Sequence, residues 1–349
     1  MLSNRKNQHL DIVLSGRGQA EVANAGFDAI AFEHACLPEL HMDEVKLDTD
    51  FLGKQISAPI MISSMTGGPD RAAMINRNLA LACHELNLAL AVGSQRIAIE
   101  SHEAAGLGAE LRRIAPSIPL LANFGAAQLN LGFGIDEARR AIDMIGADAL
   151  IIHLNALQEA VQGEGDRDWS GLLNRIEALA GSFPMPIVAK EVGSGISGRL
   201  AKRLVDAGVS VIDVAGAGGT SWAAVEAERA TSPRQAATAR AFVDWGQPTA
   251  LAIADVRRAC PETIIIGSGG IRNGVDVAKA IRLGADVAGQ AAGALHAATI
   301  SPDAVIEHFT VIIDQLRIAC FCTGSGSVRD LRHAPLQKTF AEVVCLQAG

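Results

Sequence analysis

The stretch DALIIHLNALQEAVQ, residues 148–162, begins as a continuous aliphatic run and ends in a cluster of polar side chains. An apolar run of this length, bounded by polar residues, predicts a buried β-strand. Similar runs recur along the chain at residues 58–68, 88–96, 118–125, 186–195, 209–219, 263–272 and 285–293. Segments with helical periodicity lie between them, at residues 71–86, 136–146, 197–208 and 273–284. Buried strands that alternate with helices predict a parallel sheet.

Eight such strands predict an α/β fold in which the sheet closes on itself, the (β/α)8 TIM barrel. A doubly wound sheet more often has about five to seven strands and an early G-x-G-x-x-G motif. We expect one domain over residues 1–349, with an N-terminal extension (1–50), the barrel (51–320) and a C-terminal tail (321–349). The long segment after the sixth strand, residues 222–250, predicts a lid. Both terminal segments are expected to fold over the barrel or to join subunits.

The composition argues against several function classes. The chain has 30 Lys and Arg residues against 38 Asp and Glu residues, and its formal charge of −8 disfavours general binding to nucleic acid or to anionic membranes. An anionic ligand must therefore meet positive groups that are gathered locally. The six cysteines form no C-x-x-C pair, which favours reduced thiols in a cytoplasmic protein. No apolar run approaches the ~20 residues of a membrane span, so we expect a soluble protein.

The polar cluster after residue 152 consists of His153, Asn155, Gln158 and Glu159. In TIM barrels the active site lies at the carboxyl ends of the strands, which is where this cluster would be delivered. His153 and Asn155 alternate with a leucine, so in a strand they would point to the same side. The alternative is a structural pair that hydrogen-bonds at the end of the strand.

Glycine-rich segments predict a phosphate site after the last two strands. The segment GSGGIRNG, residues 267–274, leads into a helix, and AGQAAGA, residues 288–294, contains mainly small residues. Backbone N–H groups in such loops and the dipole of a following helix bind phosphate. After the eighth strand the contacts would come from the backbone of Ala291 and Ala292.

Polar residues at other strand ends suit a flavin. Lys190 would face the N1 and O2 atoms, where reduction of the ring places negative charge. The alternative for Lys190 is an ion pair with Glu191 or with a neighbouring residue. The other residues in this set are Ser64, Met65, Thr66, Ser94, Asn123 and Thr220.

Taken together, the motifs resemble type 2 isopentenyl diphosphate isomerase, the flavin-dependent family that interconverts isopentenyl and dimethylallyl diphosphate. The resemblance covers nearly the whole chain. The matching motifs are RKNQH (5–9), SMTGG (64–68), GSQR (93–96), HLNALQEAVQ (153–162), KEVG (190–193), DVAGAGGTSWA (213–223) and SGGIR (268–272). The resemblance implies an FMN-containing barrel that is a homo-oligomer, a tetramer or an octamer. It also implies that the enzyme needs Mg²⁺ and reduced FMN, with NADPH as the reductant, and catalyses no net redox change.

The same resemblance implies residue roles. Glu159 would bind the metal, and Gln158 would be the catalytic residue that faces the substrate, framed by His153 and Asn155. The diphosphate would be held by Arg5, Lys6, Ser94, Gln95, Arg96 and Gln158. The cofactor would be held by Ser64, Met65, Thr66, Ser94, Asn123, Lys190, Thr220, Gly270, Ile271, Arg272, Ala291 and Ala292. The use of Arg5 and Lys6, together with His9, requires the N-terminus to fold across the barrel mouth.

Two alternatives stay open from the sequence. An FMN-dependent 2-hydroxy acid oxidase shares the barrel, the lysine and the phosphate site. Its chemistry relies on a His base and an Arg clamp, often in an H-G-G-R motif, where this chain reads AGAGGTSWA at residues 215–223. The second alternative is a barrel that binds flavin or phosphate without turnover. The absence of tyrosine also removes a residue that some flavin barrels place near the ring.

Overall fold

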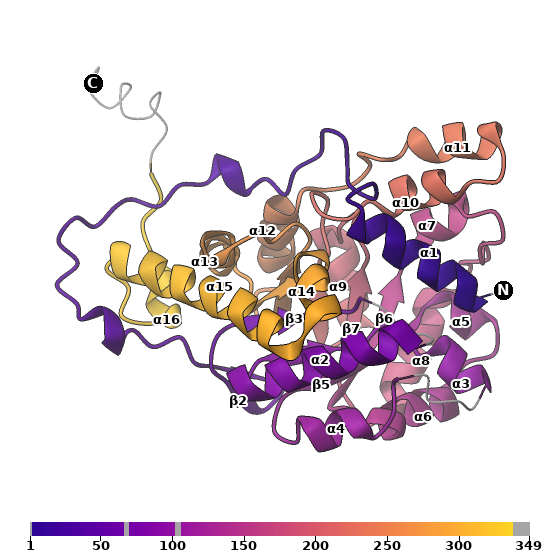
Figure 1. Ribbon diagram of the computed structural model, residues 1–349, viewed down its shortest axis with the longest axis horizontal. Coiled ribbons are helices and arrows are strands. Elements are labelled where there is room, and N and C mark those ends of the chain that lie inside the picture. Colours follow the sequence, from indigo (N-terminus) through magenta and orange to yellow (C-terminus); the bar gives the residue numbers. More distant parts are fainter. Residues whose placement is uncertain (1, 66–69, 102–105, 338–349) are drawn as a thin grey trace.

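The computed structural model describes residues 2–65, 70–101 and 106–337 (Figure 1). Within them, eight parallel strands form a closed barrel in the order β10-β3-β4-β5-β6-β7-β8-β9. The fold prediction is therefore confirmed. The barrel strands are β3 (Ile60–Ile62), β4 (Ala89–Ala91), β5 (Leu120–Gly125), β6 (Ala149–Leu154), β7 (Ile187–Glu191), β8 (Val211–Asp213), β9 (Ile264–Ser268) and β10 (Val287–Gln290).

Small and branched side chains fill the barrel interior. Ala89, Ile151 and Val211 are fully buried members of this cluster, and Phe51 and Ile56 pack against it. The last two residues belong to an antiparallel hairpin of β1 (Thr49–Phe51) and β2 (Lys54–Ile56). The interior is thus a packed core, and space for a ligand is left only beyond it.

Helices surround the barrel, as the alternation of strands and helices predicts. Two of them end where a glycine adopts a left-handed conformation, at Gly146 (φ 64°) and Gly284 (φ 116°). The surrounding helices are α2 (Asp70–Leu86), α3 (Arg96–Ser101), α4 (Glu110–Ile114), α5 (Ala127–Asn130), α6 (Ile135–Ile145), α8 (Leu172–Ser182), α9 (Gly198–Asp206), α12 (Thr249–Ala259), α13 (Gly274–Leu283), α14 (Ala292–Ile300) and α15 (Pro302–Cys322).

The inserted segment after β8 forms two helices, α10 (Trp222–Arg229) and α11 (Pro233–Arg240). They pack on each other and on α7 (Ala156–Val161), which follows β6. The N-terminal helix α1 (Leu2–Leu14) contacts both α10 and α14. The N-terminus therefore folds across the barrel mouth, as the predicted use of Arg5 and Lys6 requires (Figure 1).

The chain that follows α1 makes a wide excursion along α13 and α15 before it enters the hairpin (Figure 1). It carries the short 3-10 helices η1 (Phe27–Ala29) and η2 (Met42–Glu44). Backbone bridges join Phe32 to Leu336 and Lys46 to Ser327, which precedes α16 (Val328–Leu331). In the described residues, η1 and α16 contact α13 and η2 contacts α15, so these parts of the two terminal segments pack on helices of the barrel. Among the described helices, none has the length and apolar character needed to cross a membrane.

Candidate active site

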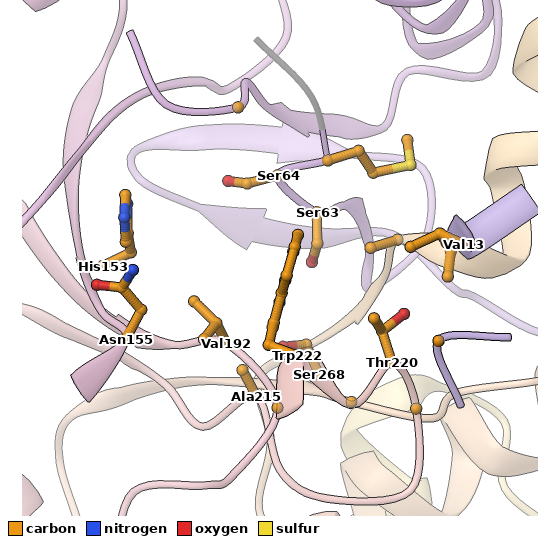
Figure 2. Close-up of a pocket in the computed structure, with 18 of the residues that line it drawn as sticks. Val13, Ser63, Ser64, His153, Asn155, Val192, Ala215, Thr220, Trp222 and Ser268 are labelled. Atoms are coloured by element: carbon orange, nitrogen blue, oxygen red, sulfur yellow. The ribbon is translucent and has the colours of Figure 1, made fainter. Parts of the chain in front are cut away.

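A cavity of about 730 Å³ lies at the carboxyl ends of the barrel strands, beneath α1. Figure 2 shows Ser63 and Ser64, which follow β3, His153 in β6 and Thr220 after β8 around one space that also receives the Trp222 ring. Of the predicted site residues, the cavity is lined by Arg5, Lys6, Ser64, Met65, Ser94, Arg96, Asn123, His153, Asn155, Gln158, Glu159, Lys190, Thr220, Gly270, Ile271, Arg272, Ala291 and Ala292. Thr66 lies outside the described residues.

Gln95 is a predicted substrate residue that does not line the cavity. Its side chain is fully buried. The amide Nε2 donates to the carbonyl of Ala141 at 2.9 Å, and Oε1 accepts from the backbone N–H of Asn123 at 2.8 Å. Because Ser94 and Arg96 face the cavity, the residue between them points away from it. Gln95 therefore holds β5 against α6, and the prediction of a direct substrate contact does not match this geometry.

His153 belongs to a hydrogen-bonded frame at the end of β6. Asn123 donates through Nδ2 to Ser64 Oγ at 2.8 Å and to the carbonyl of Val92 at 3.1 Å, so its Oδ1 is the acceptor. The proton on His153 is therefore assigned to Nδ1, which lies 2.8 Å from Asn123 Oδ1. Burial, together with the charges of Lys190 and Lys6, lowers the pKa of His153 to about 3. At neutral pH His153 is an uncharged hydrogen-bonding group.

Asn155, Gln158 and Glu159 come together because α7 begins directly after β6. On a helix, positions three and four apart share a face. Asn155 Nδ2 donates to Glu159 Oε1 at 2.8 Å and to Gln158 Oε1 at 3.2 Å. Burial raises the pKa of Glu159, although hydrogen bonds from Asp166 and Asn155 oppose the rise. Asn155 therefore orients both neighbouring side chains.

The surroundings of Glu159 do not form a ready-made cation cage. Its Oε2 accepts from the backbone N–H of Asp166 at 2.8 Å, and the carboxylate of Asp166 pairs with Arg96 at 2.8 Å. Within the part of the chain that is described, no group of three or more His, Cys, Asp or Glu side chains is placed to hold a metal. Mg²⁺ often uses one or two carboxylates with water and phosphate oxygens, and a single Glu159 fits that pattern.

Two cationic side chains from α1 enter the same region. Lys6 Nζ donates to the carbonyl of Ser94 at 3.2 Å. Burial and the nearby charges of Arg5 and Arg96 lower the pKa of Lys6 to about 8. The Nε of Arg5 is buried without a hydrogen-bond partner among the described residues. Buried positive groups with unused donors suit an anion, whereas Arg96 already pairs with Glu100 at 2.9 Å and with Asp166.

The glycine-rich end of β9 forms one side of a second anion site. Gly269 and Gly270 have φ values of 105° and 69°, and a Cβ on Gly270 would lie 2.5 Å from the carbonyl oxygen of Gly218. Only glycine fits this turn. Ala291 and Ala292 begin α14, which has no side-chain cap. The first N–H groups of a helix have no partner within it, so those of α14 can face an anion.

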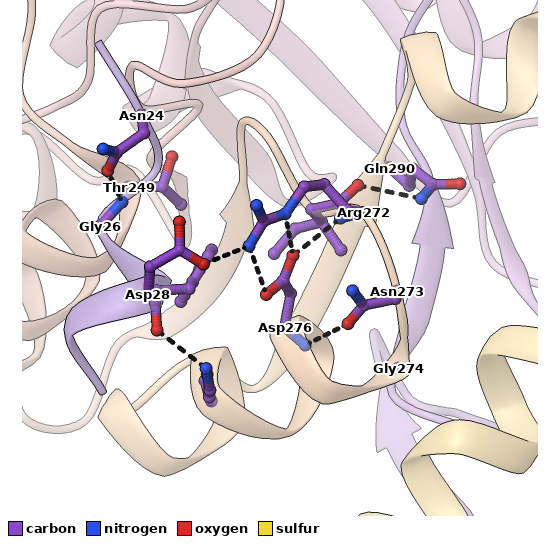
Figure 3. Close-up of polar contacts among 12 residues, drawn as sticks. Asn24, Gly26, Asp28, Thr249, Arg272, Asn273, Gly274, Asp276 and Gln290 are labelled. Atoms are coloured by element: carbon purple, nitrogen blue, oxygen red, sulfur yellow. Dashed lines mark hydrogen bonds and ion pairs between the residues drawn. The ribbon is translucent and has the colours of Figure 1, made fainter. Parts of the chain in front are cut away.

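The helix that directly follows β9 does not supply this dipole, although GSGGIRNG suggested that it would. Asn273 Oδ1 caps α13 by accepting from the N–H of Asp276 at 2.9 Å (Figure 3). Arg272 is bound there as well, with its Nε 2.9 Å from Asp276 Oδ2 and its Nη2 2.8 Å from Asp28 Oδ1. The hydrogen bonds that Arg272 donates to these two carboxylates raise its pKa. The guanidinium of Arg272 is thus committed to carboxylates rather than free for a phosphate.

Lys190 lies in a row of inward-facing residues with His153 and Asp213 on neighbouring strands. Its Nζ donates to the backbone carbonyl of Glu191 at 2.6 Å. The carboxylate of Glu191 instead accepts from backbone N–H groups, including Gly193 at 2.6 Å. The alternative of an ion pair between Lys190 and Glu191 is therefore wrong, and the Lys190 side chain lines the cavity.

Sequence reasoning missed Glu226, which lies in the predicted lid. This buried carboxylate accepts from His9 Nε2 at 2.9 Å, from Arg229 at 2.5 Å and from Gln158 Nε2 at 3.4 Å. Burial acts to raise its pKa, but the bond from His9 and the charges of His9 and Arg229 outweigh this and lower it. An acidic residue within the alanine-rich stretch WAAVEAER was the available signal.

Known proteins resemble this chain over nearly its full length. The isopentenyl-diphosphate delta-isomerase of Stutzerimonas stutzeri is 61% identical over 96% of this chain and 97% of its own length. The one from Xanthobacter autotrophicus is 59% identical over 95% of this chain and 96% of its own length. The chain belongs to the isopentenyl-diphosphate delta-isomerase family. The sequence model of the FMN-dependent dehydrogenase family also matches residues 140–338 of this isomerase-family chain.

Solved structures share the fold of this isomerase-family member at much lower identity. A flavocytochrome b2 variant with sulfite bound has a TM-score of 0.68 at 17% identity, covering 94% of this chain and 82% of its own. A mandelate oxidase variant has a TM-score of 0.64 at 15% identity, covering 93% of this chain and 94% of its own. These likenesses show the barrel fold alone.

The cavity of this isomerase-family chain fits FMN. A Cβ on Gly219 would lie 2.7 Å from the backbone nitrogen of Gly270, so the lack of side chains keeps this end of the cavity open. The Oγ of Ser63 lines the cavity and is buried without a partner among the described residues. Together with Lys190 and the uncapped start of α14, these groups match a phosphate at one end and a polar ring edge over the strands.

Proposed function

We propose that this protein interconverts isopentenyl diphosphate and dimethylallyl diphosphate in isoprenoid biosynthesis, with reduced FMN and Mg²⁺ as cofactors and NADPH as the reductant. The observation that carries the proposal is that one cavity joins two unlike anion sites. The backbone of Gly270 and the start of α14 form one, and the cationic side chains of Arg5 and Lys6 beside Glu159 form the other.

The anion site formed by Arg5 and Lys6 suits a diphosphate. Arg5 and Lys6 supply positive charge, and Glu159 would hold a Mg²⁺ ion that offsets the negative charge of the diphosphate. The Arg5 Nε that has no partner in the described structure would gain one. Holding the diphosphate in this way places the alkene of the substrate at a defined position in the cavity, which lowers the entropy cost of the reaction.

The alkene end of the substrate would lie beside Gln158. Bonds to Asn155 and Glu226 hold the amide of Gln158. Because an amide does not ionise, its role would be to position the substrate. Shifting the double bond requires one proton to be added and another removed, and a positioned acid or base typically contributes ~10²–10⁴-fold. Reduced FMN, when bound, supplies proton exchange near N5 and an electron-rich ring beside the positive charge that develops on the substrate. The chain excludes water through α1 and the Trp222 ring, which packs edge-on against His9.

A 2-hydroxy acid oxidase is less well supported. The segment after β8 reads AGAGGTSWA at residues 215–223 and contains neither a histidine base nor an arginine clamp. The relatives at 59–61% identity carry the isomerase name. A hydroxy acid that reduced the bound flavin would favour this alternative. Tight FMN binding without any turnover would favour a barrel that binds without catalysis.

The test is to purify the protein, record its flavin spectrum and assay isopentenyl diphosphate with FMN, NADPH and Mg²⁺, omitting each in turn. Incubation in deuterated buffer with reduced FMN should place deuterium on the exchanged carbons of the substrate. Failure to isomerise and to exchange under these conditions would reject the proposal. We also propose a cytoplasmic homo-oligomer, a tetramer or an octamer, which light scattering on the FMN-loaded protein would measure.

A further inference from the structure

His308 lies on α15 and reaches the anion site that is formed by β9 and α14. It lines the cavity, and its Nε2 is 2.6 Å from Oε1 of Gln290, the last residue of β10. Gln290 Nε2 donates to the carbonyl of Ile271 at 2.9 Å, a contact seen beside Arg272 in Figure 3. The amide oxygen of Gln290 therefore faces His308, and the proton on the imidazole is assigned to Nε2. Burial lowers the pKa of His308, which favours the neutral ring.

The side chain of Gln290 lies between the two halves of the anion site, the glycine turn after β9 and the start of α14. Its side chain is 4% exposed. One end binds Ile271, which follows the Gly269–Gly270 turn, and a Cβ on Gly293 would lie 2.8 Å from its amide carbon. Gly293 is in the first turn of α14. The Gln290 side chain therefore sets the spacing between the glycine turn and the helix start.

An amide in this position has two possible orientations, and only one is compatible with its neighbours. If the Gln290 amide were reversed, its oxygen would face the carbonyl oxygen of Ile271, and two acceptors would repel each other. The carbonyl of Ile271 fixes this orientation, and the N–H assigned to His308 Nε2 adds a second hydrogen bond that holds the amide oxygen in place. A buried acceptor or donor that loses its partner costs about as much as a full hydrogen bond, which corresponds to about tenfold in an equilibrium constant.

We propose that His308 is a positioning residue for the phosphate of the flavin cofactor. Through Gln290 it holds the glycine turn and the start of α14 at the spacing that accepts a phosphate, and it thereby makes the site select FMN over riboflavin. The inference rests on the proposed placement of the FMN phosphate between β9 and α14. In this way α15, one of the helices that surround the barrel, takes part in the selection of the cofactor.

The experiment compares the affinities of FMN and riboflavin for the cofactor-free protein, measured by quenching of flavin fluorescence. His308→Leu keeps the side-chain volume but removes the donor, and we expect about tenfold weaker FMN binding with riboflavin binding unchanged. His308→Gln restores an N–H near the position of Nε2, and FMN affinity should return to within about threefold of the parent. His296→Gln, on the exposed face of α14, is the matched control and should change neither affinity.

Gln290→Met tests the same link from the other partner. It should reproduce the loss of FMN affinity, and combining it with His308→Leu should add little, because both changes break one chain of contacts. Equal losses for FMN and riboflavin, a His308→Leu protein that keeps its FMN preference, or failure of His308→Gln to rescue would each overturn the proposal. A parent protein without any preference for FMN would instead reject the placement of the phosphate. Isomerase activity does not enter these measurements.

Discussion

His9 in α1 donates a hydrogen bond of 2.9 Å to Glu226 in α10, although the two residues are 217 positions apart in the sequence. The imidazole of His9 also packs edge-on against Trp222, with ring centroids 5.1 Å apart. The pair ties the N-terminal helix, which carries Arg5 and Lys6, to the inserted segment after β8. Closure of the cavity by α1 therefore depends on a contact between the N-terminal extension and the segment inserted after β8.

Removing this link should weaken substrate binding without affecting FMN. His9→Phe keeps a ring against Trp222 but loses the donor, and a hydrogen bond to a charged group contributes about 1.5–3 kcal/mol. We expect KM for isopentenyl diphosphate to rise about tenfold or more, while the Kd for FMN stays the same. His41→Phe, a change at an exposed histidine, is the control. Unchanged KM in His9→Phe would show that α1 docks independently of this bond.

Glu159 should determine the response to magnesium. Glu159→Gln removes the charge that we assign to the metal and keeps an acceptor oxygen for only one of the two donors, Asn155 Nδ2 or the backbone N–H of Asp166. Isomerase activity should fall by about 10²-fold or more, and higher Mg²⁺ concentrations should be needed, since carboxylates bind Mg²⁺ far better than amides. The flavin absorbance spectrum should be unaltered. Glu164→Gln, at an exposed position nearby, should behave like the parent. Loss of flavin from Glu159→Gln would contradict the assignment.

Lys190 should raise the reduction potential of bound FMN. Its positive charge favours the reduced ring, which carries negative charge near N1. A hydrogen bond to a charged group contributes about 1.5–3 kcal/mol, or ~30–65 mV for a two-electron couple. Lys190→Gln should therefore lower the midpoint potential by about this amount, as measured by spectroelectrochemical titration. Lys202→Gln, on the exposed face of α9, is the control and should leave the midpoint potential unchanged. A potential that does not change would place Lys190 away from the ring.

His153 should make stability depend on pH. Its pKa is about 3 in the folded protein against an ordinary value of 6.5. Between these values the unfolded chain binds a proton that the folded chain does not, so stability falls as the pH is lowered through this window. The melting temperature of the cofactor-free protein should fall from pH 7 to pH 5, and His153→Asn should make that dependence shallower. Equal slopes in the two proteins would show that the histidine titrates normally.

A repeated arginine clamp should stabilise the amino-terminal ends of the strands. Arg257 donates to the carbonyls of Gly284 (2.9 Å) and Thr263 (2.9 Å) and to Asp286 Oδ2 (2.7 Å). Arg112 makes the same pattern before β5 and β6, with Gly146 at 2.9 Å, Ile118 at 2.9 Å and Asp148 at 2.7 Å.

Arg257→Leu leaves these acceptors without a donor and should lower the free energy of unfolding by about 1–3 kcal/mol in urea titrations. Its neighbour Arg258 is exposed, and its one ion pair, with Asp255, is long at 4.0 Å. Arg258→Leu should therefore change the free energy of unfolding by less than about 0.5 kcal/mol. Similar effects of the two substitutions would argue against the clamp.

Local patterns in the sequence were enough to predict the barrel. The run at residues 148–155 predicts a strand, and β6 covers Ala149–Leu154. The periodic segment at residues 273–284 likewise corresponds to α13, Gly274–Leu283. Strand burial and helix periodicity depend on neighbours along the chain, so they can be read without knowing the contacts. Because parallel strands end on one face, the sequence also predicted which polar side chains meet there.

What the sequence determined by itself is therefore the fold class, the end of the barrel that carries the site and a set of candidate residues, nearly all of which line the cavity. Tertiary structure decided which groups are free to bind. Gln95 and Arg272 carry suitable side chains, but the first bonds Ala141 and the second bonds Asp28 and Asp276. Glu226 bonds Gln158 and His308 bonds Gln290, each from a helix distant in sequence. The physical reason is that a polar group's role depends on whether its hydrogen bonds are already satisfied, and those partners come from parts of the chain that only folding brings together.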